Sequence, residues 1–470
     1  MAAMSSRRLP HILKRFSSTV TITTKATPSK THHHKTIPSS SFPAGYILTG
    51  LYAGVKKTPP TPDLAVVLST TDKAPAAAGC FTRNAFKAAP VLVCEELLQG
   101  GEGGRARAVV VNSGCANAVT GKQGLEDAWA MVKATDELLS SSTSTGENQK
   151  AETLVMSTGV IGQNLPIKKI LAGISQSAST LGTDFESWEK AALAFMTTDT
   201  FPKLRARSFF VNDVEYKIAG MSKGAGMIHP DMGPPSSALH ATLLSLVVTD
   251  APVSPPALQK ALNYAVDRSF NSISVDGDMS TNDTLIVLAN GAAGGSELTE
   301  GSQGWETFRD ELTRFAAELA QLVVRDGEGA TKFVTVSVYE APSYADAHAI
   351  ASKISTSALV KTALYGEDAN WGRILAATGA VPLPSSSPAA PLALDPTRVS
   401  VSFLPSDNSE PLPVLVNGEP QKVDEDRAKV ILQEEEFEVE VKLGMGNESA
   451  KYWTCDFSYE YVRINGDYRS

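Results

Sequence analysis

The stretch 221–251 contains the residue types needed for self-cleavage of the chain. Its letters are MSKGAGMIHPDMGPPSSALHATLLSLVVTDA, so a glycine-rich turn with Lys223 precedes the pair Ala241-Thr242 and the apolar run 243–248. A threonine hydroxyl directly after a small residue can attack the preceding carbonyl, and hydrolysis then frees a new amino-terminus at Thr242. That amine, with an ordinary pKa of about 7.7–8.0, can act as general base for the hydroxyl of the same residue. The same letters also fit a β-branched residue that opens a buried strand.

The segment 157–162, SerThrGlyValIleGly, offers groups that could stabilise an oxyanion. Its small residues permit close approach of the backbone, and Pro166 suits the start of a helix shortly afterwards. Backbone N–H groups together with the Thr158 hydroxyl would donate hydrogen bonds to a negatively charged oxygen. The alternative is an ordinary turn between a strand and a helix.

Two other short segments carry reactive or charged side chains. Cys115, within AsnSerGlyCysAlaAsn at 112–117, has no histidine near it in the sequence, so we expect a small packed residue and not a nucleophile. Glu328 lies between two glycines. Its carboxylate could meet a cationic substrate, or the residue could simply lie in a surface turn.

The histidines argue against a metal site. Outside residues 1–42 only His229, His240 and His348 remain, and they are scattered along the sequence. A histidine-based metal centre or catalytic triad needs several such side chains or their partners close together, and the sequence shows no such grouping. The run HisHisHis at 32–34 lies in a low-complexity segment, and we interpret it as solvated tail. We therefore expect neither a metal nor a bound cofactor.

The elements that must position these residues alternate between strand and helix patterns. Short apolar runs at 64–69 and 108–112 are typical of buried strands, and 333–338, 399–403 and 437–443 indicate further strands. Apolar residues at helical spacing predict helices around 125–132 and 305–322. The fold class is therefore α/β, with helices packed in layers on mixed sheets. We expect surface loops at 140–150 and 382–396, and the second is a candidate divider before a C-terminal segment.

The charge is distributed unevenly. The first acidic residue is Asp63, and nine basic residues precede it among many serines and threonines. This composition is typical of an organelle transit peptide, and residues 9–16 could form the short amphipathic helix needed for import. A disordered tail without a targeting role is the alternative. Residues 1–42 carry seven basic and no acidic side chains, so without them the formal charge changes from −9 to −16.

The composition also excludes several classes of protein. The 470 residues contain no uninterrupted apolar run near the ~18 residues of a membrane-spanning helix. Net negative charge argues against a nucleic-acid or anionic-membrane surface. Four cysteines without CxxC spacing are too few for a disulfide scaffold, which favours a reducing compartment.

Nine motifs together resemble one family, the ornithine acetyltransferases, also called arginine biosynthesis bifunctional proteins or glutamate N-acetyltransferases. The resemblance extends from about Ala44 to Ser470. Its motifs are AAGCFTRN (77–84) with AAPV (88–91), NSGCAN (112–117), STGVIGQ (157–163), MTTDTFPK (196–203), SKGAGMIHP (222–230), SVDGDMSTNDT (274–284), GEGATK (327–332), GEDANWGRI (366–374) and YVRINGDYRS (461–470).

The resemblance implies an enzyme that cleaves itself at Ala241-Thr242. Residues 1–42 would be a mitochondrial transit peptide and flexible leader, residues 43–241 an α chain, and residues 242–470 a β chain. The two chains would stay associated as a heterodimer or heterotetramer in the mitochondrial matrix. No nucleic-acid or membrane partner is implied.

The resemblance also implies the reaction and its residues. Thr242 would take acetyl from N2-acetylornithine and pass it to glutamate, and acetyl-CoA would serve as a second acetyl donor. Thr158 and Gly159 would form the oxyanion hole. Substrate would be bound by Thr197 or Thr198, Lys223, Thr242, Glu328, Asn465 and Ser470.

One departure from the family pattern leaves alternatives open. Residues 233–240, GPPSSALH, appear as an insertion directly before the cleavage pair. They could displace the attacked carbonyl, loop out, or reflect an error in the gene structure. A self-processing aminopeptidase-type hydrolase and an unprocessed, non-catalytic paralogue are therefore the competing hypotheses.

Overall fold

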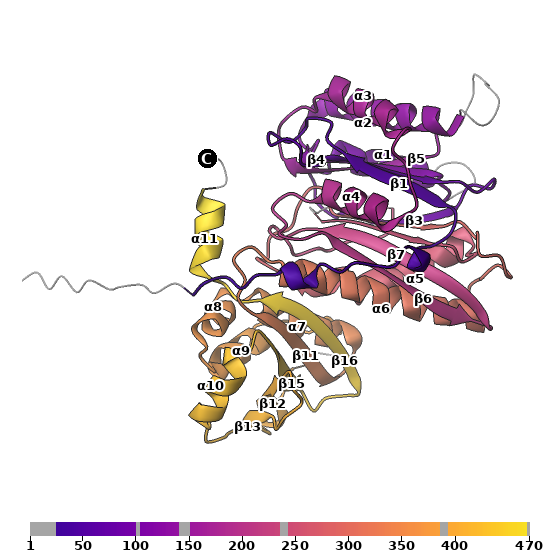
Figure 1. The fold of residues 1–470 in the computed structure, drawn as a ribbon. Helices are drawn as coiled ribbons and strands as arrows, with labels where there is room; N and C mark the ends of the chain where they lie inside the picture. Colours follow the sequence, from indigo (N-terminus) through magenta and orange to yellow (C-terminus); the bar gives the residue numbers. More distant parts are fainter. Residues whose placement is uncertain (1–24, 100–103, 141–150, 236–242, 386–392, 468–470) are drawn as a thin grey trace, which may run out of the picture.

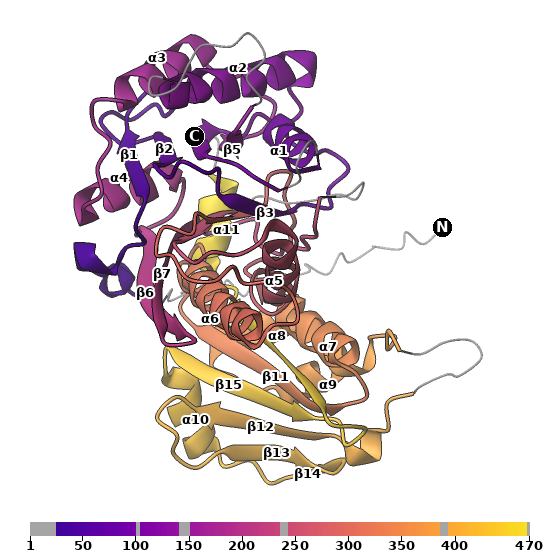
Figure 2. The ribbon, with the colours of Figure 1, turned by 90° about the vertical axis from the view of Figure 1, so that its right-hand side faces the viewer.

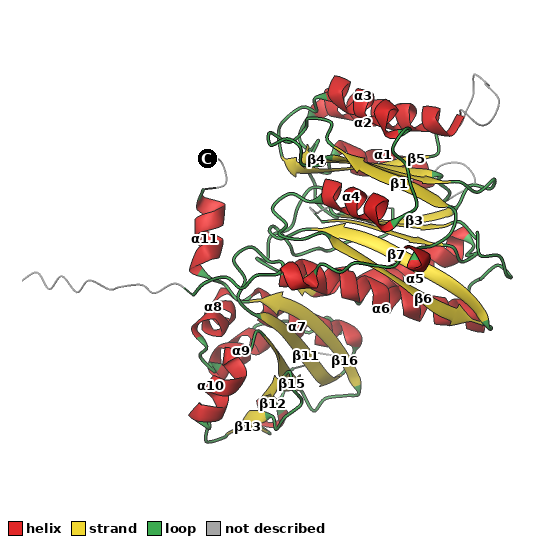
Figure 3. Cartoon of the chain, viewed as in Figure 1, coloured by secondary structure: helices red, strands yellow, loops and turns green. Residues whose placement is uncertain are grey.

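The computed structural model describes residues 25–99, 104–140, 151–235, 243–385 and 393–467 (Figure 1). Its first part is a stack of helix, sheet, sheet and helix layers, and a third sheet with its own helices forms the second part. Figure 2 shows these layers one below another. The mixed α/β class predicted from the sequence is confirmed (Figure 3).

The first sheet has the strand order β1-β2-β4-β5, so β5 lies at an edge. The strands β1 and β2 and the strands β2 and β4 pair antiparallel, whereas β4 and β5 run parallel. Helices α2 and α3 cover its outer face (Figure 1), and α1 lies along the free edge of β5, where Cys94 Sγ contacts the N–H and carbonyl of Val155. The bounds are β1 Tyr46–Leu51, β2 Leu64–Ser69, β4 Ala108–Cys115, β5 Thr153–Val160, α1 Ala89–Gln99, α2 Gly121–Ser140 and α3 Ile167–Ser177.

The second sheet has the order β3-β10-β8-β7-β6 and packs face to face with the first. Successive side chains of a strand point to opposite faces. Leu244 of β8 therefore joins the core between the two sheets, while Leu243 joins the core beneath α5 and α6. The bounds are β3 Ala76–Phe81, β6 Lys203–Val211, β7 Val214–Lys223, β8 Leu244–Thr249, β10 Thr284–Ala289, α5 Pro255–Asp267 and α6 Gln303–Arg325.

Helix α4, Phe185–Phe195, lies at the side of the stack, against β1 and β2 of the first sheet and β6 and β7 of the second. Asp184 caps its N-terminus by accepting from the Ser187 N–H. Trp188 is fully buried. The helix leads directly into the loop with Thr197 and Thr198, so it delivers that loop to the space between the sheets.

The second part of the molecule is a seven-stranded sheet of order β14-β13-β12-β15-β11-β16-β9. Strand β11 pairs with β15, and β15 pairs with β12, so chain from both sides of residues 382–396 shares one sheet. The prediction that this stretch divides two units is therefore wrong. The strands are β9 Ile273–Ser274, β11 Phe333–Ala341, β12 Ser400–Pro405, β13 Leu412–Val416, β14 Glu419–Pro420, β15 Glu436–Lys442 and β16 Glu448–Cys455.

Helices α7 and α10 pack on this sheet, α8 and α9 pack against α7, and α11 follows the last strand. The bounds are α7 Tyr344–Thr356, α8 Ala358–Gly366, α9 Trp371–Gly379, α10 Glu425–Gln433 and α11 Tyr459–Gly466, and four single-turn helices span Thr31–His33, Ser39–Ser41, Phe270–Ser272 and Pro396–Arg398. None of the helices in the described part of the chain is both long and apolar enough to span a membrane.

The predicted secondary structure agrees closely with these elements. The apolar stripe at 305–322 is the buried face of α6, which the Ser302 hydroxyl caps. The alternating pattern at 437–443 is β15, whose apolar residues are buried every second position. The predicted loop at 140–150 lies almost wholly outside the described residues, as do residues 386–392 of the second predicted loop.

Residues 25–42 form a strap along the surface of the molecule. Lys25 pairs with Glu367 at 2.8 Å, and buried Lys30 pairs with Glu435. Phe42 stacks on Trp188 with ring centroids 4.4 Å apart. The histidine run belongs to this strap: the ring of His33 contacts that of Phe201 at 5.6 Å, so the prediction of a solvated tail is wrong at this residue. The processing cut expected near residue 42 stays a prediction.

Candidate functional site

The end of β7 lies beside the start of β8. Lys223, the last residue of β7, is the register partner of Leu244, the first residue of β8. Ala241 and Thr242 lie outside the described residues, as do residues 236–240 of the predicted insertion. Because Thr242 lies two residues before Leu244 in the sequence, the pairing brings Lys223 beside the start of the strand that follows the predicted nucleophile.

Lys223 is a buried cation in a network of charges. Burial lowers the pKa of its ammonium group, while the carboxylates of Asp199, Asp283 and Glu328 oppose that change. The side chain is 3% exposed. The ammonium form of a lysine fixed inside the protein suits recognition of a substrate carboxylate.

A buried ion triad of Lys203, Asp199 and Asp326 lies next to Lys223. The Nζ of Lys203 lies 2.5 Å from Asp199 Oδ1 and 2.6 Å from Asp326 Oδ2, and all three side chains are fully buried. Burial alone would raise the pKa of Asp199, but the ammonium groups of Lys203 and Lys223 hold it below its usual range. The two ammonium groups therefore favour the charged form of Asp199, whereas burial raises the pKa of Asp326 against the effect of Lys203.

Asp199 also holds the predicted substrate loop. Its carboxylate accepts from the Thr197 N–H at 2.9 Å and from the Gly224 N–H at 2.7 Å. The loop after α4 is thereby fixed to the residue that follows Lys223. Thr197 is half-buried and Thr198 is exposed.

Glu328 and Asn465, which are 137 residues apart, meet at the same site. Asn465 Nδ2 on α11 donates to Glu328 Oε2 at 2.9 Å, and the Glu328 N–H donates to the Ala225 carbonyl at 2.8 Å. A Cβ on Gly226 would lie 2.3 Å from Glu328 Oε2, so the carboxylate packs directly against this glycine. Glu328 is 9% exposed, which excludes the surface-turn alternative. Ser470 lies outside the described residues.

The Thr158-Gly159 turn ends β5 with an unusual backbone. Gly159 has φ of +125°, and a Cβ there would lie 2.4 Å from the Gly114 carbonyl carbon. The prediction that small residues allow close backbone approach is confirmed at this pair. The Thr158 hydroxyl is buried and has no hydrogen-bond partner among the described residues. An unsatisfied buried donor is available to an oxygen atom of a ligand.

Lys56 is a site residue that sequence reasoning missed. It lies beside Gly114, since a Cβ on that glycine would come within 3.2 Å of Lys56 Cγ. Burial lowers the pKa of Lys56 to about 8, and Lys223 adds to this effect against Asp63 and Asp199. In the sequence Lys56 is one of nine basic residues before the first acid, and it lies outside every motif that carries the family resemblance.

Asp283 was missed as well, although it lies in the 274–284 motif. The residue is fully buried, and neither carboxylate oxygen has a hydrogen-bond partner among the described residues. Burial raises the pKa of this carboxyl well above its usual value, and only Lys223 opposes the change. Acidic residues are common in turns, so the sequence alone gave no reason to expect this one inside the protein.

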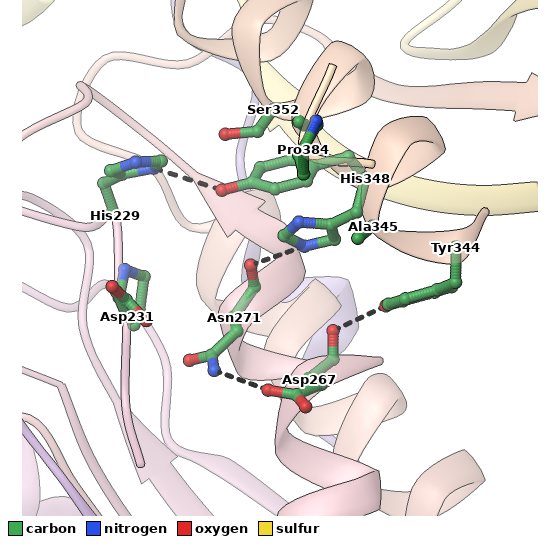
Figure 4. A pocket seen from close by; sticks show the side chains of 12 residues that line it. His229, Asp231, Asp267, Asn271, Tyr344, Ala345, His348, Ser352 and Pro384 are labelled. Carbon is green, nitrogen blue, oxygen red and sulfur yellow. Dashed lines mark hydrogen bonds between the residues drawn. The ribbon is translucent and has the colours of Figure 1, made fainter. Parts of the chain in front are cut away.

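A cavity of about 480 Å³ lies elsewhere, between the loop around His229 and helix α7 (Figure 4). We call it the α7 cavity. It brings together His229 and His348, which are 119 residues apart in the sequence. The Tyr452 hydroxyl lies 3.1 Å from His229 Nδ1, and His348 Nε2 lies 3.1 Å from the Asn271 carbonyl.

The polar groups of the α7 cavity are largely satisfied by one another. Asn271 Nδ2 donates to Asp267 Oδ1 at 3.0 Å, and the Tyr344 hydroxyl donates to the Asp267 carbonyl at 2.8 Å (Figure 4). No group of three or more potential metal ligands occurs within the described ranges. None of the predicted site residues within the described ranges lines this cavity, so we place the candidate site between the sheets, at Thr158, Lys223 and Glu328.

Comparison with known proteins gives consistent matches over nearly the whole chain. The ArgJ family profile matches residues 47–470. The mitochondrial arginine biosynthesis bifunctional protein ArgJ of Laccaria bicolor is 68% identical over 469 residues, covering 98% of this chain and 99% of that protein. The protein of the same name from Coprinopsis cinerea is 67% identical over 474 residues, with 98% and 99% covered. The crystal structure of the bifunctional protein argJ from Bacillus halodurans is 36% identical, covers 46% of this chain and 95% of that chain, and has a TM-score of 0.41.

Proposed function

This chain belongs to the ArgJ family, and from that membership we propose that it transfers acetyl from N2-acetylornithine to glutamate through an ester on Thr242. The protein is a mitochondrial acyltransferase, a bifunctional enzyme of arginine biosynthesis. The finer proposal rests on one observation. Lys223, Glu328 with Asn465, and the Thr158-Gly159 turn converge where the strand that follows Thr242 begins.

Maturation precedes catalysis in this proposal. The Thr242 hydroxyl attacks the Ala241 carbonyl, the C–N bond between the two residues breaks, and the Thr242 nitrogen takes the proton. Water then hydrolyses the resulting ester and leaves Ala241 with a carboxylate. The products are chains 43–241 and 242–470, which stay associated as a heterodimer or heterotetramer.

The substrate groups find partners of opposite charge. N2-acetylornithine carries a carboxylate and a side-chain ammonium group, and glutamate carries two carboxylates. Lys223 supplies a buried cation for a carboxylate, and Lys56 a second one beside Gly114. Glu328, held by Asn465, supplies the anion for the ammonium group. Thr197, Thr198 and Ser470 complete the proposed substrate contacts.

Transfer then takes two steps. The Thr242 oxygen attacks the acetyl carbonyl, the acetyl–nitrogen bond breaks, and the Thr242 proton passes through its amine to ornithine as it leaves. The α-amine of glutamate next attacks the acetyl ester, the Thr242 oxygen leaves, and the proton from glutamate returns to it. Both steps place negative charge on the same oxygen, next to Thr158 and Gly159. Acetyl-CoA enters as an alternative donor in the first step.

The test uses the purified full-length protein. We expect two fragments by intact mass, the second with Thr242 at its amino-terminus. Incubation with N2-acetylornithine alone should release one equivalent of ornithine and add one acetyl group to that fragment, and glutamate should remove it. Thr242→Ala should abolish both cleavage and acetylation.

Three results would overturn the proposal. A single intact chain without transfer activity supports the non-catalytic paralogue. Steady release of acetate without an acceptor supports the hydrolase. Acetylation that persists in Thr242→Ala places the nucleophile elsewhere. Thr242→Ser is the matched variant, because it keeps a hydroxyl at the same position.

A further inference from the structure

Asn282 links the two sheets at the candidate site. It lies two residues before β10 begins at Thr284, and it is fully buried. Its Nδ2 donates to the Ala116 carbonyl at 2.6 Å and to the Ser157 carbonyl at 2.7 Å. Both carbonyls belong to the first sheet or its following turn, so a side chain of the second sheet is bonded to the ends of β4 and β5.

One of these bonds fixes the peptide that carries Thr158. The Ser157 carbonyl and the Thr158 N–H belong to the same planar peptide unit. Holding that carbonyl therefore sets the direction of the Thr158 N–H and the start of the turn at Gly159. The edge position of β5 makes such a partner valuable, because an edge strand has a row of backbone groups without a neighbouring strand.

The Asn282 side chain is itself held in one orientation. The Thr281 hydroxyl donates to Asn282 Oδ1 at 2.6 Å, which leaves both amide hydrogens directed at the two carbonyls. On the far side of the turn, the Ser157 hydroxyl donates to Asn112 Oδ1 at 2.6 Å, and Asn112 Nδ2 donates to the Cys115 carbonyl at 2.9 Å. The end of β5 is thus fixed from two directions.

The same segment is tied to the strand of the nucleophile. The Thr284 N–H donates to the Leu243 carbonyl at 2.7 Å, and Thr284 is the register partner of Leu244. Asn282 and Thr284 are only two residues apart. The distance between the start of β8 and the Thr158-Gly159 turn is therefore set by a short, fully hydrogen-bonded piece of chain.

We propose that Asn282 is a positioning residue for the acetyl transfer, holding the Thr158-Gly159 oxyanion turn at a fixed distance from β8, the strand that follows Thr242 in the sequence. The inference rests on the proposed function, because Asn282 has this positioning role only if the Thr158-Gly159 turn binds the oxyanion. Asn282 acts through the turn and does not touch substrate. Its effect should therefore appear in the transition state and not in substrate binding.

The experiment replaces Asn282 by alanine and uses Asn290→Ala as the matched control. Asn290 follows the other end of β10, and its Nδ2 donates to the Ala44 and Gly45 carbonyls at 2.9 and 3.1 Å. Each variant loses an amide with two bonds to carbonyls. We expect Asn282→Ala to lower kcat of the cleaved enzyme about tenfold to hundredfold with KM for acetylornithine unchanged. Asn290→Ala should keep kcat within about twofold.

A double variant tests whether Asn282 acts through the turn. Thr158→Val should lower kcat by itself, and adding Asn282→Ala should cost much less than it does in the wild-type background. Full additivity of the two losses would overturn the inference. So would an Asn282→Ala enzyme with wild-type kcat, or one whose loss lies only in KM.

The two failures can be told apart. If Thr158→Val keeps full activity, the oxyanion assignment in the proposed function fails. If Thr158→Val is impaired and Asn282→Ala is not, only the present inference fails. Where Asn282→Ala yields no folded protein, Thr281→Val removes the hydroxyl that orients Asn282 and should lower kcat in the same direction by a smaller factor, and an unchanged kcat there overturns the proposal.

Discussion

Two regions of this molecule contain buried ionisable groups, and they treat those groups in opposite ways. In the α7 cavity the side chains satisfy one another, through pairs such as Tyr452 with His229 and Asn271 with Asp267. At the site between the sheets, the Thr158 hydroxyl and both oxygens of Asp283 have no partner within the described residues. The first region encloses a cavity of about 480 Å³, and the second has the buried polar groups without hydrogen-bond partners.

This difference teaches that buried polar groups without partners point to a site in this fold that a cavity by itself does not mark. A buried polar group without a hydrogen bond costs about 1–3 kcal/mol of folding free energy. Such groups are rare in folded proteins, so their occurrence at Thr158 and Asp283, near the buried Lys223, indicates a functional role and not only packing. Binding of a substrate oxygen or ammonium group would supply the missing partners.

The largest expected effect lies in the support of the site between the sheets. Lys203→Met leaves the carboxylates of Asp199 and Asp326 buried without their cation, so the free energy of unfolding should fall by about 3–5 kcal/mol. Thermal unfolding followed by circular dichroism measures it. Lys260→Met, which removes an exposed pair with Glu300, is the control and should change stability by less than about 1 kcal/mol. Equal losses in both variants would mean that the triad is not a core support.

The next largest effect is a loss of activity when the buried lysine of the site between the sheets is replaced. Lys223→Met removes the buried cation, and kcat/KM for acetylornithine should fall about tenfold to hundredfold. Lys217→Met, on the same strand but away from the site, should keep kcat/KM near the wild-type value. A Lys223→Met enzyme with normal kcat/KM would show that the carboxylate is bound elsewhere.

A smaller effect concerns pH and Lys56. Its pKa of about 8 means that the side chain is charged below that pH and neutral above it. The KM for glutamate should therefore rise as the pH passes through about 8. Lys56→Arg, which stays charged, should move that rise to higher pH. The opposite sign, a KM that falls over this range, would exclude Lys56 from carboxylate binding.

The same pKa has a consequence for stability. Between about pH 8 and the ordinary lysine pKa of 10.5, the unfolded chain keeps the Lys56 proton and the folded chain does not. The unfolded state then binds more protons, so this residue makes folding more favourable as the pH rises through that window. Lys56→Arg should remove this contribution, which unfolding at pH 8 and pH 10 would measure.

The smallest effect is expected in the α7 cavity. His348→Asn removes the ring that lies 3.1 Å from the Asn271 carbonyl, and it should cost about 1 kcal/mol of stability. Acetyl transfer should stay within about threefold of wild type. If this variant lost activity as Lys223→Met does, the contrast between the two regions would collapse.

The sequence predicts the elements of this fold well because the hydrophobic pattern is local. The buried stripe of α6 and the alternation in β15 follow from residues a few positions apart. The resemblance also suggested Glu328 and Asn465 for one site, and the structure joins them by a hydrogen bond.

What the sequence could not give depends on pairing between distant strands. Lys56, Asn282 and Asp283 reach the site only because β8 pairs with β10 and the two sheets face each other. A lysine near the start of the chain and polar residues in a turn are common, so these residue types alone do not mark a site. The roles assigned to Thr242 and Ser470 stay predictions, because both residues lie outside the described part of the chain.

The strap formed by residues 25–42 affects whether the two cleavage products stay together after import processing. If the chain is cut before Thr242, the strap belongs to the first product but holds the second, through Lys25 with Glu367 and Lys30 with Glu435. Import processing and partner retention then depend on the same stretch of chain. A protease that removes residues up to 42 would remove both ion pairs between the first and second products. A cut before Lys25 would keep both pairs in every molecule.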